Sequence, residues 1–88
     1  MKKYRCVYDG GNFIDSIEYN TIEEAQHAAE EILTAWTNEP MTDEEHDIMV
    51  CECMTWVEEF DETENEWIDI WYPSDDFCES IGFVERMV

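Results

Sequence analysis

The sequence predicts an α+β domain in which an antiparallel sheet of four to five strands carries one main helix on one face. Short runs of strand-forming residues lie on both sides of a single stretch with helical periodicity, and turn signals separate the runs. No repeat or linker divides the 88 residues, and a chain of this length builds only one small core. We therefore expect a single domain, residues 1–88, with the order β-β-α-β-β and a C-terminal element left open between helix and strand.

The first half of the chain is expected to form a hairpin and then the main helix. Residues 4–8 are rich in strand formers, residues 13–19 alternate as a partner strand, and an Asp-Gly-Gly-Asn turn signal lies between them. Thr21 and Glu24 have the spacing of a capping box. Apolar residues then recur with helical period over residues 22–36, before a proline stops the helix.

The second half is expected to complete the sheet. Residues 39–47 hold five acids and are interpreted as a loop, while residues 48–60 are strongly apolar and are interpreted as the third strand. An acidic turn leads to a fourth strand over residues 67–72. The tail is expected to form a short helix at 75–80 and an edge strand at 83–87.

The charge balance decides which partners this chain can have. It holds 24 Asp and Glu against 4 Lys and Arg, so the formal net charge is −20. Binding to nucleic acid through phosphates needs clustered cations, and docking on anionic lipid needs the same, so both are argued against. The chain is nevertheless 44% hydrophobic and 14% aromatic, which is atypical of acidic disordered chains. We expect a folded protein whose partner is basic.

No segment of the chain matches the zinc-site spacings or the calcium-binding loop motif in full. The four cysteines allow three disulfide pairings, none of them favoured, and Cys51 and Cys53 would place both sulfurs on one face of a strand without a zinc-ligand spacing. Asp61 opens a segment resembling an EF-hand loop, but Glu66 stands where the loop requires glycine and Tyr72 where it requires glutamate. No metal and no cofactor are expected.

Catalytic and targeting signals are also weak. His27 and His46 both lie among acids and are interpreted as solvated side chains, and there is no phosphate-binding glycine loop or nucleophile elbow. No secretory signal or membrane span is recognised, so a cytoplasmic location with reduced thiols is expected. An enzyme is therefore the least favoured class.

The density of carboxylates is the strongest functional signal. Spread evenly over a surface of about 5,400 Å², 24 acids give one per about 225 Å², but gathered on half of it they approach the roughly 100 Å² per phosphate of duplex DNA. On a strand, the same-face step of about 6.7 Å is about twice the 3.4 Å rise per phosphate. The candidate partner-binding residues form three sets, one on the expected hairpin, one on the helix and one in the expected loop: Glu58, Glu59, Asp61, Glu62, Glu64 and Glu66; Glu23, Glu24, Glu30 and Glu31; and Asp43, Glu44, Glu45 and Asp47.

In size, composition and element pattern, the chain resembles the small acidic DNA-mimic inhibitors of phages and mobile elements, including anti-CRISPR and anti-restriction proteins. The resemblance implies a non-enzymatic inhibitor that occupies the nucleic-acid groove of a CRISPR effector or a restriction enzyme. The alternative is an acidic adaptor or antitoxin-like module that binds a basic protein for reasons unrelated to nucleic acid, and acidity as an adaptation to high salt is a third reading. Aromatic residues flank the acidic hairpin, and most of them are expected in the core with some as interface anchors: Trp56, Phe60, Trp67, Trp71 and Tyr72.

Overall fold

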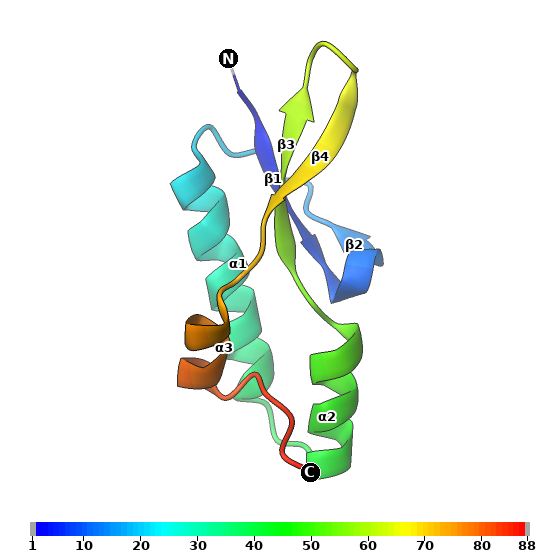
Figure 1. The fold of residues 1–88 in the computed structure, drawn as a ribbon, viewed down its shortest axis with the longest axis vertical. Helices are drawn as coiled ribbons and strands as arrows, with labels where there is room; N and C mark the ends of the chain where they lie inside the picture. The colour runs from blue at the N-terminus through cyan, green and yellow to red at the C-terminus, as the bar shows by residue number, and fades with distance from the viewer. Residues whose placement is uncertain (1, 88) are drawn as a thin grey trace.

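The sheet holds four strands that pair antiparallel in the spatial order β2-β1-β3-β4. The computed structural model describes residues 2–87. In chain order the elements are β1 (Tyr4–Tyr8), the 3₁₀ turn η1 (Asp9–Gly11), β2 (Phe13–Ile14), α1 (Ile22–Thr37), α2 (Asp43–Glu52), β3 (Trp56–Asp61), β4 (Glu66–Trp71) and α3 (Asp75–Ile81). The predicted α+β class is confirmed, and Figure 1 shows α1 lying along one side of the sheet.

Helix α1 forms as the sequence predicts. The Thr21 hydroxyl accepts a hydrogen bond from the Glu24 backbone N–H at 3.3 Å and so caps the first turn. Ala25 and Ala29 are fully buried against β1 and β3, where they pack on a cluster that includes Cys6. These small side chains let the helix approach the two central strands closely, and this contact forms the first core cluster.

A second core cluster lies below the sheet, at the other end of α1. Leu33 packs there with Cys78 of α3 and Phe83, and partly buried residues of α2 complete the cluster. Figure 1 shows the β3–β4 hairpin at one end of the molecule and α2, α3 and the C-terminal segment at the other. Two cores in series explain an elongated body of 44 × 20 × 20 Å, whose radius of gyration of 13.8 Å exceeds the roughly 12 Å typical of 88 residues.

The predicted loop at 39–47 and the predicted strand at 48–60 are wrong, because α2 occupies Asp43–Glu52 and β3 begins only at Trp56. The Thr42 hydroxyl accepts a hydrogen bond from the Glu45 N–H at 3.1 Å. Three acids in the first turn also stabilise the helix, because they lie at the positive end of its dipole. The acidic run is therefore a helix start. The apolar residues that follow it pack against α1 and α3 rather than in the sheet.

Two other segments differ from the prediction. The partner strand predicted at 13–19 is interrupted: Phe13–Ile14 forms β2, the Asp15 side chain then accepts the backbone N–H of Ile17 at 3.0 Å, and Tyr19 pairs with Tyr4 of β1 again through backbone hydrogen bonds of 2.9 and 2.7 Å. The helix predicted at 75–80 is confirmed as α3, but the edge strand predicted at 83–87 is wrong. These residues form the C-terminal tail (residues 83–87), which lies against α2.

Candidate interaction surface

The carboxylates lie on the surface. None of the 24 acids is buried; 17 are exposed and seven are partly exposed. Four of them pair with the four Lys and Arg side chains, which leaves 20 without such a partner among residues 2–87. The paired acids are Glu58, Glu59, Glu18 and Asp43. Since the cations are all engaged internally, almost the whole negative charge faces solvent.

The predicted hairpin set divides into paired and unpaired acids. Glu58 and Glu59 lie in β3, where register brings them opposite β1. The Glu58 carboxylate contacts the Arg5 guanidinium at 2.8 Å, and the Glu59 carboxylate contacts the Lys2 ammonium at 3.2 Å. Hydrogen bonding to Glu59 raises the pKa of Lys2 above its usual value, which keeps this cation charged. Both acids are therefore already engaged within the fold.

The acids at the hairpin turn are more available. Asp61 is partly exposed and accepts the backbone N–H groups of Thr63 and Glu64 at 2.9 and 3.3 Å, so it shapes the turn. Glu62, Glu64 and Glu66 are exposed, and none pairs with a Lys or Arg in the described chain. Three free carboxylates thus lie at one end of the rod.

The predicted helix set lies along α1. Glu23, Glu24 and Glu31 are exposed and Glu30 is partly exposed. The side chain of His27 is 73% exposed, as the sequence predicts, and contacts Glu31 at 2.9 Å. This helix supplies four carboxylates on its solvent side.

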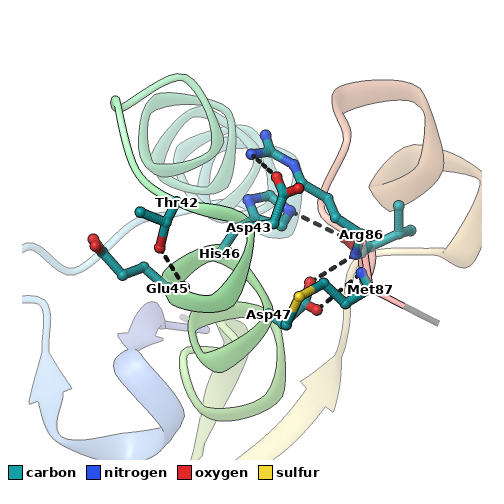
Figure 2. A network of polar contacts seen from close by, with 8 residues as sticks. Thr42, Asp43, Glu45, His46, Asp47, Arg86 and Met87 are labelled. Carbon is teal, nitrogen blue, oxygen red and sulfur yellow. Dashed lines mark hydrogen bonds and ion pairs between the residues drawn. The ribbon is translucent and has the colours of Figure 1, made fainter.

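The predicted third set lies on α2 and has two roles. Glu44 and Glu45 are exposed, without a Lys or Arg partner in residues 2–87. Asp43 pairs with Arg86 at 3.5 Å, and Asp47 accepts two backbone N–H groups of the C-terminal tail at 2.6 and 3.0 Å (Figure 2). Asp47 therefore holds the tail on the helix, and only Glu44 and Glu45 are free in this set.

The expectation that His46 is solvated is wrong, because its side chain is fully buried beneath the C-terminal tail. Its Nε2 atom lies 3.0 Å from the carbonyl oxygen of Val84, so the imidazole joins α2 to the tail (Figure 2). The Nδ1 atom is buried, and it has no hydrogen-bond partner among residues 2–87. A single acidic segment, read alone, cannot reveal that residues 38 positions later cover this histidine.

The cysteines are all free thiols. Cys51 lies in the last turn of α2 and Cys53 directly follows that helix, so the expected strand with both sulfurs on one face does not form. Burial raises the pKa of the Cys6 thiol to about 11 and that of Cys53 to about 11. No group of three or more potential metal ligands occurs in the part of the chain that the structure describes.

The charge is distributed along the whole rod. Acids occur on all three described helices and on the β3–β4 hairpin, rather than gathering on one of them. The net charge of −20 over 44 Å is one negative charge per about 2.2 Å, against one phosphate per about 1.7 Å of duplex DNA. The linear charge density of the molecule is therefore about three quarters of that of duplex DNA.

The side of the sheet that faces away from α1 is an open face, which sequence analysis missed. Cys6 and its register partner Val57 are buried against α1, so the residues next to them in the chain, Arg5 and its own partner Glu58, lie on the opposite side. Among the described helices only α1 packs broadly on the sheet. We call the opposite side the open face; its residues are Arg5, Trp56, Glu58, Phe60, Trp67, Asp69 and Tyr72.

A connected network covers the open face. The Arg5 guanidinium lies 4.2 Å from the centre of the Trp67 ring, and its Nε donates a hydrogen bond to one carboxylate oxygen of Glu58 at 2.9 Å. The Trp56 indole N–H donates to the other Glu58 oxygen at 3.1 Å. Tyr72 then packs against Trp56 with ring centres 5.7 Å apart. Aromatic rings and an ion pair replace the second layer that would cover a sheet in a larger protein.

The comparisons with known proteins leave the function open. The chain matches no protein-family model, no curated protein and no solved structure. Within residues 2–87, no helix is both long enough and apolar enough to cross a membrane.

Proposed function

We propose that this protein is a non-enzymatic inhibitor whose carboxylates occupy the phosphate-binding positions of a nucleic-acid-binding protein and so block the binding site of that protein. The linear charge density carries the proposal, because one net negative charge per about 2.2 Å over 44 Å approaches the one phosphate charge per about 1.7 Å of duplex DNA. The target is a basic protein with a nucleic-acid groove. The resemblance to anti-CRISPR and anti-restriction proteins makes a CRISPR effector or a restriction enzyme the first target to test.

The unpaired carboxylates are the proposed contact residues. Opposite charge steers the encounter, so association with a basic groove is fast and weakens steeply as salt rises. Of the three predicted sets, the exposed acids that have no Lys or Arg partner among residues 2–87 qualify; they lie on α1, on α2 and at the hairpin turn: Glu23, Glu24, Glu31, Glu44, Glu45, Glu62, Glu64 and Glu66. Glu58, Glu59 and Asp47 instead support the fold, and their loss would act through stability.

A displacement assay tests the proposal. Labelled duplex DNA is bound to a purified restriction enzyme, or to a guide-loaded CRISPR effector, and the protein is added over a range of salt concentrations. We expect the protein to release the DNA at low salt and to lose this ability progressively as salt rises. Released DNA, with the protein in its place on the target, supports the mimic.

Two matched variants locate the contact. One carries Glu62→Gln, Glu64→Gln and Glu66→Gln at the hairpin, and the other carries Glu23→Gln, Glu24→Gln and Glu31→Gln on α1, so both lose three charges. We expect at least one of them to displace DNA less effectively than the unchanged protein while its circular dichroism is preserved. A protein that binds a basic target without competing with DNA is the adaptor of the alternative reading, and that result overturns the mimic.

A further inference from the structure

The open face already contains one arginine-binding arrangement, which is occupied by a residue of the chain itself. Arg5 lies 4.2 Å from the centre of the Trp67 ring and pairs with Glu58 at 2.8 Å. An aromatic ring beneath a guanidinium and a carboxylate at its edge are the two contacts that arginine favours in protein interfaces. Both partners are largely covered, with 20% of the Arg5 side chain and 15% of the Glu58 side chain exposed.

A second arrangement of the same kind lies beside the first, and none of the cations in residues 2–87 pairs with it. It consists of Trp56, Asp69 and Tyr72, which we call the Asp69 site. Asp69 is the register partner of Glu58 across β3 and β4, so both carboxylates lie on the open face. The Tyr72 hydroxyl donates to the Asp69 carboxylate at 2.8 Å, and the Tyr72 ring packs on Trp56. Asp69 is exposed and Tyr72 is 49% exposed, so a partner can reach them.

We propose that the open face is a docking surface for a basic protein and that an arginine of this partner binds at the Asp69 site. Its guanidinium stacks on the exposed ring of Tyr72 and pairs with the Asp69 carboxylate, as Arg5 does with Trp67 and Glu58. The proposal rests on the proposed function and names its partner more closely, since arginine is the residue that nucleic-acid grooves use to hold phosphates.

Charge complementarity selects this occupant over two others. Aromatic sheet faces in other proteins stack the bases of single strands, but a net charge of −20 repels a polyanion. A second copy of the chain carries the same charge and is repelled in the same way. Lysine fits less well than arginine, because an ammonium is strongly hydrated and cannot stack on a ring as a planar group does.

Hexaarginine and hexalysine peptides test the inference on the intact protein. Both peptides carry the same charge, so the general attraction of the acidic surface is common to them and only the difference reports on guanidinium recognition. We expect hexaarginine to bind about tenfold more tightly and to shift the NMR signals of the Trp56 indole N–H and of the Asp69 and Tyr72 amides.

The variants separate the site from the general charge. Asp69→Asn and Tyr72→Ala are expected to abolish the preference for hexaarginine, while Tyr72→Phe keeps the ring and retains most of it. Glu39→Gln is the matched control, because it removes one charge at an exposed residue that lies between α1 and α2, outside the sheet, and that has no Lys or Arg partner among residues 2–87. Equal affinity for the two peptides, or equal effects of Asp69→Asn and Glu39→Gln, overturns the inference. Binding of a single-stranded oligonucleotide to the open face overturns it as well.

The outcome is independent of the displacement assay. If Asp69→Asn displaces DNA from the target as well as the unchanged protein does, the open face is not the contact and the proposed function is unaffected. If the unchanged protein prefers hexaarginine but displaces no DNA, the docking surface stands and the proposed function fails.

Discussion

The contacts of Glu58 join β1 to β3, so its replacement should lower the free energy of unfolding. Its side chain is 15% exposed, its two oxygens accept hydrogen bonds from Arg5 Nε at 2.9 Å and from the Trp56 indole at 3.1 Å, and Arg5 Nη2 forms an ion pair with it at 2.8 Å. Glutamine keeps one acceptor oxygen but turns an N–H₂ group towards a donor and leaves Arg5 without its counter-charge. Hydrogen bonds to charged groups contribute about 1.5–3 kcal/mol each, so we expect Glu58→Gln to lower the free energy of unfolding by about 2–4 kcal/mol.

This loss is large for a domain of 88 residues, whose total stability is expected to be about 4–13 kcal/mol. Urea unfolding followed by far-ultraviolet circular dichroism measures it without relying on the fluorescence of Trp56 or Trp67. Glu62→Gln removes the same charge at the exposed turn and is the control, with an expected change below about 0.5 kcal/mol. In a double variant, Arg5→Met should add less than its single effect, because both changes remove the same pair. A Glu58→Gln protein as stable as the Glu62→Gln control would refute the reasoning.

Three further results are expected. Asp47→Ala removes the acceptor of two tail N–H groups, so hydrogen exchange at the amides of Arg86 and Met87 should accelerate about tenfold in NMR; an unchanged rate would show that the tail is held without Asp47. Burial raises the pKa of Cys6 to about 11, so the folded state retains a proton that the unfolded state loses near pH 9. Stability should then fall as pH rises from about 9 to about 11, and less steeply in Cys6→Ala. Finally, the melting temperature should rise between 20 and 500 mM NaCl as repulsion is screened among the 20 carboxylates that have no Lys or Arg partner in residues 2–87, and a decrease would contradict this.

The sequence predicts correctly those elements that are stabilised by residues close together in the chain. Helix α1 follows from a capping threonine and a continuous apolar stripe, and α3 follows from the break after β4. Helix α2 was missed although Thr42 and Glu45 also have the capping spacing, because the apolar run from Ile48 to Val50 reads equally well as a strand. Its packing against Phe83 in the second core cluster decides between the two, and that contact joins distant parts of the chain.

The candidate surface is predictable in composition but not in detail. The exposure of the acids follows from their type, since charged side chains are rarely buried. Which acids are free depends on strand register, because the pairing of Glu58 with Arg5 joins residues 53 positions apart. The expectation that most of the five hairpin aromatics lie in the core is wrong, because only Trp71 packs on a core cluster and the other four lie on the open face. Composition indicates that Trp56 and Trp67 need a packing partner, but only topology shows that no described helix covers their side of the sheet.

The high negative charge keeps the open face from binding a second copy of the chain. An exposed aromatic sheet face on a neutral protein would favour self-association. Two copies with a charge of −20 each, about 25 Å apart, repel by about 3 kcal/mol even at physiological salt when treated as screened point charges in water, and by several times more at low salt. The same field attracts a basic protein. The charge that keeps two copies apart therefore leaves Trp56 and Tyr72 available and selects which partner can reach them.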